Sequence, residues 1–253
     1  MTEEKIEFLM REITELKDKY NSLHLKLQEE KAFLIGKLDF TATLEGETIS
    51  DYYLIKIEFP QSYPDVPPIT EEIGGRIPKN IDHHVYPDKT LCLGPPIKVL
   101  LKFKKEPTLL NFIENLLIPI LYWHSHRERY PEKPLPAYPH GDHGIKEYHN
   151  ETNLKENYFS LFESDDINVI LLLMKMVIDG TYKSNPKCPC RRRGLKLKDC
   201  HGNNLQLLLD MPYLKKHINL DYKKLLQEAK ENGEITDIRP FLRKRKRIIQ
   251  KSK

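Results

Sequence analysis

Three of the four cysteines in this 253-residue chain lie close together near its C-terminal end, and a histidine follows the last of them. The four donors are Cys188, Cys190, Cys200 and His201. Three thiolates and one imidazole are a complete tetrahedral ligand set for Zn²⁺. A short loop without a core of its own gains folding energy from such an ion. The cluster therefore predicts a structural zinc site, because four protein ligands leave no position open for catalysis.

The segment that holds these donors, CPCRRRGLKLKDCHG, resembles the SEC-C motif, the zinc-binding element at the end of the SecA translocation ATPase and in many bacterial proteins. That motif usually has the form C-P-C-G-S-G-x-K-x-K-x-C-H-G. Residues 191–193, all arginine, stand in place of Gly-Ser-Gly, whereas Lys196 and Lys198 are retained. The resemblance implies a zinc module over residues 184–203. Its basic side chains suit docking to an acidic partner or nucleic acid; the alternative is that the ion only stabilises the local fold.

Hydrophobic periodicity predicts an α+β fold for the first part of the chain. Apolar residues recur with helical spacing over residues 3–32. Strand-like alternation follows over 33–44 and, more regularly, over 52–59. Prolines then end the second strand, because proline cannot donate a hydrogen bond into a sheet. We expect a short strand with long irregular stretches over 69–105, and a helix over 108–123.

The second part of the chain predicts helices. An apolar helix is expected over 167–178, behind a capping run of serine and aspartates, and shorter helices over 205–209 and 220–230. We therefore expect two domains. Residues 1–160 form the α+β domain, and residues 161–253 form a helical region with the zinc module and a basic tail.

Composition and charge limit the broad class of the protein. Hydrophobic residues make up 39% and charged residues 31% of the chain, which fits a globular protein. No stretch reaches the roughly 18 apolar residues that a membrane helix needs, and the N-terminus lacks the apolar core of a secretory signal. We therefore expect a cytoplasmic protein with no membrane partner. The net charge is +4, and its basic excess lies over residues 239–253, which form either a solvated tail or a patch for nucleic acid or an acidic partner.

The chain around the remaining cysteine, Cys92, resembles the ubiquitin-conjugating enzymes. The segment DYYLIKIEFPQSYPDVPP is a strand followed by Phe-Pro, Tyr-Pro and Pro-Pro, and GGRIPKNIDHHVYPDKTLCL then leads to the cysteine. That family has an N-terminal helix, a meander of antiparallel strands, a Tyr-Pro/Pro-Pro stretch, a histidine-bearing loop, a Leu-Cys-Leu active site and then a helix. The resemblance covers residues 3–150 and implies a ubiquitin-conjugating-like fold with C-terminal helices.

Residues 67–93 more narrowly resemble bacterial members of this superfamily, which show P-x-x-x-E-x-x-G-R-I-P, then D-x-H, then L-C-L. The matching positions are Pro68, Glu72, Gly75, Arg76, Ile77, Pro78, Asp82, His84 and Cys92. The run YPHGDHGIKEY, over 138–148, looks like the His-Gly-x-x-Gly stretch of those proteins. Several of them belong to ubiquitin-like conjugation systems in CBASS antiphage operons. The resemblance thus implies a role in antiviral defence, with the C-terminal tail of a nucleotidyltransferase, the cyclic-nucleotide synthase of such an operon, as the protein partner.

Cys92 is suited by its chemistry to carry an acyl group. A thiolate is both the nucleophile that attacks an acyl thioester and a good leaving group when an amine takes the acyl group away. Turn-forming residues precede Cys92 and Gly-Pro-Pro follows it, so we expect it on an exposed loop that two proteins can reach in turn. The alternative is a buried structural cysteine, since free cysteine is among the most buried residue types.

Helper residues for Cys92 are expected among nearby histidines and an aspartate. His84 best matches the family histidine, although the Pro-Asn that follows it in the family is missing here, which leaves oxyanion stabilisation unassigned. His140, Asp142 and His143 form a second polar cluster that could orient or deprotonate an incoming amine. The alternatives for that cluster are a hydrogen-bonded loop, histidines that face water, or part of a metal site.

Three functions are compatible with these features. The first is an enzyme, a ubiquitin-conjugating-like transferase that forms a Cys92 thioester with the C-terminus of a partner protein and passes it to an amine. No G-x-x-x-x-G-K-[ST] nucleotide loop is present, so the acyl group must be activated elsewhere. The second is a non-catalytic ubiquitin-conjugating-like interaction module. The third is a zinc-dependent adaptor that binds nucleic acid or the ribosome, which the mild net charge disfavours.

Overall fold

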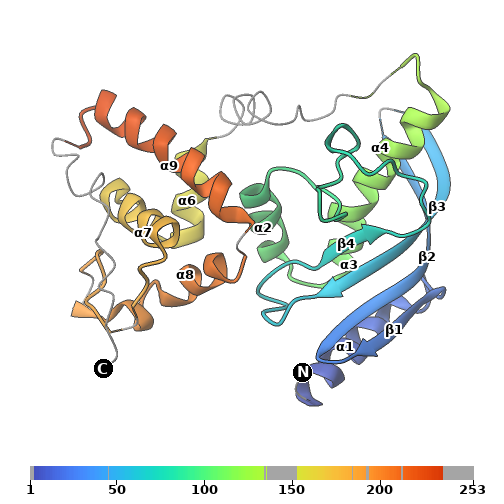
Figure 1. The fold of residues 1–253 in the computed structure, drawn as a ribbon, viewed down its shortest axis with the longest axis horizontal. Helices are drawn as coiled ribbons and strands as arrows, with labels where there is room; N and C mark the ends of the chain where they lie inside the picture. Colours follow the sequence, from blue (N-terminus) through green and yellow to red (C-terminus); the bar gives the residue numbers. More distant parts are fainter. Residues whose placement is uncertain are drawn as a thin grey trace, which may run out of the picture. The chain divides into compact units, whose positions relative to one another are not determined.

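The chain divides into two compact units, Met1–Tyr148 and His149–Lys253, here called unit 1 and unit 2. The computed structural model in Figure 1 describes residues 3–44, 46–133, 135, 153–183, 185–191, 194–211 and 213–235. The predicted domain boundary at 160/161 falls inside helix α6, Leu154–Phe162, which packs against helices of unit 2.

Unit 1 contains a four-stranded antiparallel sheet with the strand order β1-β2-β3-β4. The strands are β1 (Leu23–Gln28), β2 (Lys31–Leu44), β3 (Glu47–Phe59) and β4 (Ile69–Glu72). The helices are α1 (Glu3–Leu16), η1 (Ile81–His83), α2 (Pro96–Lys105), α3 (Leu109–Phe112), η2 (Ile113–Leu117) and α4 (Ile118–Arg129). The α+β class and the antiparallel meander are confirmed, whereas the narrower ubiquitin-conjugating-like assignment stays a prediction.

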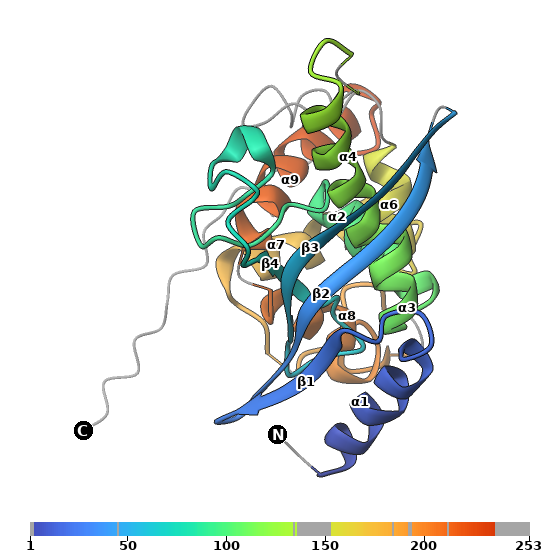
Figure 2. The same ribbon diagram turned by 90° about the vertical axis from the view of Figure 1, so that its right-hand side faces the viewer.

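The core of unit 1 lies between one face of the sheet and the continuous helix formed by α3, η2 and α4. Helix α4 contacts β2 and β3, and Figure 2 shows α3 and α4 running along that face. The alternation expected for β3 buries Tyr53, Ile55, Ile57 and Phe59 on the side that faces the helix. Burial of these large side chains is the main stabilising term for this layer.

The predicted helix over 3–32 is only partly correct. Helix α1 ends at Leu16, and Leu23, Leu25 and Leu27 alternate in β1, which pairs with β2. Gly36 in β2 permits this pairing, because a Cβ atom at that position would lie 1.9 Å from the carbonyl oxygen of Ser22. Helix α2 lies in the stretch over 69–105 that was expected to be irregular.

Arg76, in the loop after β4, connects the sheet to α4. Its Nη1 and Nη2 atoms donate to the two carboxylate oxygens of Asp51 at 2.8 and 2.7 Å, and its Nε donates to Glu128 Oε2 at 3.0 Å. The Arg76 guanidinium holds the pKa of the Asp51 carboxyl well below its usual range. The Asp51 side chain is only 9% exposed, so this pair is screened less by water than an ordinary surface ion pair.

The loop between β4 and Arg76 is organised by a buried carboxylate. Glu72 accepts hydrogen bonds from the backbone amides of Gly74, Gly75 and Ile77, at 2.8, 3.0 and 3.3 Å. A Cβ atom at Gly74 would lie 2.7 Å from Glu72 Oε1, so a larger residue there would displace this carboxylate. These contacts fix the chain that leads toward His84 and Cys92.

Unit 2 is a helical body. Its helices are α6, α7 (Ile167–Asp179), η4 (Leu197–Asp199), α8 (Gly202–Leu209) and α9 (Leu214–Glu231). Helix α7 begins at the predicted aspartate cap, where the Asp166 side chain accepts from the Asn168 amide, and it contacts α6, α8 and α9. In the buried interior, the Tyr158 hydroxyl donates to Asp221 Oδ2 at 2.7 Å, which ties α6 to α9.

We predict that Arg76→Lys lowers the free energy of unfolding of unit 1 by about 2 kcal/mol, because an ammonium cannot replace the planar fork on Asp51. Urea unfolding followed by tryptophan fluorescence measures this, since Trp123, the single tryptophan of the chain, lies in α4. Arg11→Lys, on the exposed side of α1, is the matched control and should change the value by less than about 0.5 kcal/mol. Equal effects of the two substitutions would contradict the prediction.

Candidate functional site

Cys92 follows a tight turn that fixes its backbone. The Asp88 carboxylate accepts from the amide and the hydroxyl of Thr90, at 3.0 and 2.6 Å, and Lys89 adopts a left-handed conformation with φ of 74°. The Cys92 amide then donates to the His84 carbonyl oxygen at 2.7 Å. The turn expected from the Pro-Asp-Lys-Thr sequence is therefore present, and it places Cys92 beside His84.

The Cys92 side chain is half-buried and lines a pocket of about 440 Å³ in unit 1. Its Sγ atom lies 3.7 Å from the carbonyl oxygen of Gly94, toward which the thiol is directed. The pocket is open, and residues of α2, η2 and α4 form its other walls. Cys92 is therefore not enclosed in the core of unit 1, and its side chain borders this pocket.

His84 lines the same pocket, but its described contacts are those of a structural residue. It is 3% exposed, adopts a left-handed backbone conformation, and packs the edge of its ring against Trp123 with the ring centroids 4.9 Å apart. Its backbone carbonyl oxygen accepts the hydrogen bond from the Cys92 amide. His84 thus lies next to Cys92, as predicted, and its backbone helps to hold the loop that carries Cys92.

A π-helical turn shapes the opposite wall of the pocket. The Ile118 amide donates to the Ile113 carbonyl, an i→i+5 bond within η2. Pro119 follows and has no amide hydrogen, so it cannot donate to the carbonyl of Asn115. That carbonyl instead accepts from Lys102 Nζ at 2.5 Å, which connects α2 to this turn. Such π-turns often occur at functional sites.

His124, on α4, is a buried histidine behind the Cys92 loop. It is 3% exposed and its ring stacks against that of His83, with the centroids 6.4 Å apart. Burial lowers the pKa of His124 to about 3, and the nearby His84, His83 and Arg127 act in the same direction. His124 is therefore neutral in the folded protein at physiological pH.

The other predicted helpers, His140, Asp142 and His143, lie outside the described residues. The pocket is also lined by Lys98, Lys102, Asn115 and Trp123, which were not among the predicted site residues. The helix that carries the two lysines could have been predicted. Pro96 stands in the first turn of an amphipathic stretch, which is typical of a helix start, and the buried residues of that stretch are Ile97, Leu100 and Phe103.

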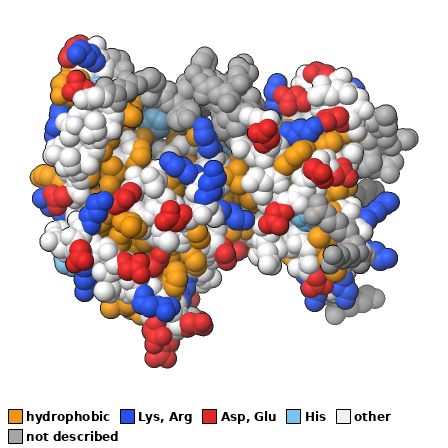
Figure 3. Space-filling view, turned by 180° about the vertical axis from the view of Figure 1, so that it is seen from behind, with side chains coloured by type: hydrophobic (Ala, Val, Ile, Leu, Met, Phe, Trp, Pro, Cys, Tyr) orange, Lys and Arg blue, Asp and Glu red, His pale blue; other side chains and the backbone are white. Residues whose placement is uncertain are grey.

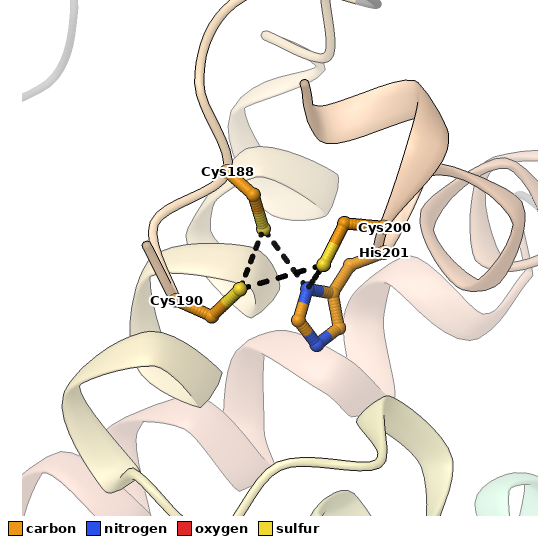
Figure 4. Close-up of side chains that lie close together, drawn as sticks. All are labelled: Cys188, Cys190, Cys200 and His201. Atoms are coloured by element: carbon orange, nitrogen blue, oxygen red, sulfur yellow. Dashed lines mark hydrogen bonds between the residues drawn. The ribbon is translucent and has the colours of Figure 1, made fainter. Parts of the chain in front are cut away.

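The four predicted metal ligands converge in unit 2. Figure 4 shows the side chains of Cys188, Cys190, Cys200 and His201 pointing toward one another. His201 Nδ1 lies 2.9 Å from Cys188 Sγ and 3.2 Å from Cys200 Sγ, and all donor atoms lie within 4.8 Å of one another. This cluster could hold a metal ion.

The backbone around the cluster explains how it forms. The Cys188 amide donates to the Leu195 carbonyl at 2.9 Å, and the Leu197 amide donates to the Pro186 carbonyl at 2.7 Å, which folds the two cysteine-bearing segments together. His201 precedes α8, and Gly202 is required because a Cβ atom would lie 2.9 Å from the Leu197 carbonyl oxygen.

The donor set fits a cation. Cys188 and His201 are buried, and burial raises the pKa of the Cys188 thiol. A bound cation acts in the opposite direction, because coordination favours the thiolate. Three sulfurs and an imidazole nitrogen are ligands that soft or borderline metal ions prefer.

Among the described residues, no helix is both long and apolar enough to cross a bilayer.

We predict that unit 1 loses stability as the pH falls below about 6.5, by up to about 1.4 kcal/mol per pH unit from His124. The pKa of His124 is lower in the folded than in the unfolded state, so between the two values only the unfolded chain takes up the proton. The contribution of neutral His124 to the free energy of unfolding is therefore complete above its pKa in the unfolded chain. It decreases as the pH falls toward its pKa in the folded protein, about 3. Unfolding followed by Trp123 fluorescence between pH 7.5 and 5 measures it.

The test compares pH slopes, so a constant loss of stability in the variant does not matter. His124→Phe should reduce the slope, whereas His24→Phe, at an exposed position of β1, should leave it unchanged. A His124→Phe slope equal to that of the unaltered protein would contradict the assignment.

No protein-family model, no curated protein and no solved structure matches the chain.

Proposed function

We propose that this protein is a ubiquitin-conjugating-like transferase that carries the C-terminal acyl group of a partner protein as a thioester on Cys92. One observation supports this most strongly. Cys92 lies half-buried at an open pocket, while the other three cysteines are drawn together in a metal-binding cluster of unit 2. One thiol of the chain thus lies outside the metal-binding cluster and borders a pocket.

The proposed reaction has two acyl transfers. The Cys92 thiolate attacks an activated acyl carbon, the C–S bond forms, and the activating group leaves. The nitrogen of an acceptor amine then attacks the thioester, the C–N bond forms, the amine loses a proton, and Cys92 Sγ leaves as the thiolate. A separate enzyme supplies the activated acyl group.

The order of elements in unit 1 supports the family resemblance. Helix α1, a meander of four strands, a loop with His84 and Cys92, and then helices follow in the order that the resemblance implies. The antiphage setting rests on the same resemblance. In that setting, the donor tail belongs to a cyclic-nucleotide synthase encoded in the same operon.

Polar groups of the pocket are candidates to stabilise the negative oxygen of each tetrahedral intermediate. Among the described pocket residues, Lys98, Lys102 and Asn115 carry side-chain donors. His140, Asp142 and His143 remain proposed to act on the incoming amine.

We further propose that the metal ion is Zn²⁺ and that it is structural. Zinc–thiolate bonds of about 2.3 Å place sulfurs around one ion about 3.8 Å apart. The sulfur of Cys190 lies 3.3 and 3.4 Å from those of Cys188 and Cys200, close to that spacing. Small outward shifts of the side chains would complete a tetrahedron.

A second candidate function is a non-catalytic interaction module. The observation that favours it is the burial of His84, whose described contact with Cys92 is through the backbone. Such a module would bind its partner equally well without the Cys92 thiol.

We predict that the protein, purified with its operon partner and activating enzyme, forms an adduct that is visible on non-reducing gels and removed by thiol. Cys92→Ala should abolish the adduct, because the nucleophile is missing. Cys92→Ser should convert it to a thiol-resistant ester. Intact-mass spectrometry identifies the attached chain.

Leu110→Asn, at an exposed position of α3 outside the pocket, is the control substitution and should keep the adduct. If Cys92→Ala retains the adduct, the proposed role of Cys92 is wrong. If partner binding persists in the absence of any adduct, the interaction module is favoured.

We predict one Zn²⁺ per chain by elemental mass spectrometry. Cys190→Ser should remove most of it and expose residues 185–211 to hydrogen exchange, because metal binding supplies much of the folding energy of such a loop. Cys92→Ser, outside the cluster, should keep the full zinc content. Equal zinc content in both variants would contradict the site.

A further inference from the structure

The pocket at Cys92 is larger than an acyl carrier needs for its thiol. It has a volume of about 440 Å³ and extends from Cys92 along α2 to η2 and α4. A pocket of that volume is in the range that binds small ligands or several side-chain groups. A group attached to Cys92 Sγ would therefore lie beside these walls.

The walls beyond Cys92 are mostly apolar. Half-buried side chains on three sides of the pocket are Leu93, Val99, Ile120 and Trp123. Several partly exposed apolar side chains in one concave place are unusual on a protein surface without a partner. Figure 3 shows, in its left half, apolar side chains of unit 1 exposed among both basic and acidic side chains.

Trp123 forms a rigid part of this wall. The His84 ring packs edge-on against it, the Arg127 guanidinium lies 5.3 Å from its ring centroid, and its Nε1 donates to the Leu135 carbonyl at 3.4 Å. A side chain held from several directions loses little freedom when a ligand binds, so it is a favourable binding surface.

Two lysines line the pocket from α2. Lys98 and Lys102 are one helical turn apart, so they project from the same face of the helix. Both are exposed, and no acidic side chain is among the described residues that line the pocket. An entering chain therefore meets positive charge beside apolar walls.

We propose that this pocket selects the acyl donor: it binds a peptide tail with a bulky apolar side chain within a few residues of the reacting carbonyl and acidic residues further along. The inference rests on the proposed function and adds a substrate class to it. The apolar side chain fills the space between Val99, Ile120 and Trp123, and the acidic residues lie along Lys98 and Lys102. A tail of small polar residues would leave the apolar walls in contact with water.

The test uses synthetic peptide thioesters, which need no activating enzyme. Four peptides of equal length end in a glycine thioester and carry either leucine or serine just before it, combined with either two glutamates or two lysines further along. The initial rate of Cys92 acylation is measured on the full-length protein by intact-mass spectrometry, with Cys92→Ala as the background. We expect leucine to be favoured over serine about tenfold, and glutamate over lysine about fivefold.

Two variants locate these preferences. Ile120→Asn should reduce the leucine preference to near one, whereas Leu110→Asn, at an exposed position of α3 outside the pocket, should keep it. Lys98→Glu combined with Lys102→Glu should reverse the charge preference. The same double change at Lys104 and Lys105, later on α2 and outside the pocket lining, is the charge-matched control. Rate ratios within one variant cancel any difference in the amount of active protein.

The outcomes separate the two proposals. If Cys92 reacts with all four peptides at the same rate, the tail-selecting pocket is wrong and the carrier function stands. The pocket proposal also fails if the preferences persist in Ile120→Asn and in the Lys98/Lys102 variant. If no peptide acylates Cys92 while iodoacetamide still alkylates it, the carrier function itself is wrong.

Discussion

The hydrogen-bonded fork between Arg76 and Asp51 anchors the loop after β4 to strand β3. Arg76 lies in the chain that leads from β4 to the Cys92 loop, and its guanidinium also binds Glu128 on α4. A planar guanidinium bound through two nitrogens fixes orientation as well as distance. Arg76 thus joins the loop after β4 to both the sheet and α4, the helix that carries one wall of the Cys92 pocket.

The sequence predicted elements well where one local pattern was unambiguous. The alternation over 52–59 and the apolar run after Asp166 both became the expected elements, β3 and α7. The spacing of Leu23 and Leu27 fits both a helix and a strand, so the local pattern could not distinguish the two conformations. Their pairing with β2 decides the conformation, and such pairing is a tertiary effect that overrides local preference.

A candidate site could be predicted from the sequence only where its residues lie close together along the chain. The metal ligands lie within fourteen positions, 188–201, and share one chemistry, so their spacing was sufficient. The pocket is different, because Cys92, Lys102 and Trp123 come from three segments that meet only after folding. Pro119 was a usable clue. Because proline lacks an amide hydrogen, the Asn115 carbonyl accepts a hydrogen bond from Lys102 instead. The sequence alone does not identify that donor.

An apolar pocket next to a carrier cysteine has a further physical consequence. A thioester is uncharged and loses little by leaving water, whereas water near it would promote hydrolysis. An apolar tail seated between Val99, Ile120 and Trp123 would exclude water from one side of the bond. The same contact that selects the donor would then also protect the acylated enzyme, while an acceptor amine could still reach the carbonyl from the open side of the pocket.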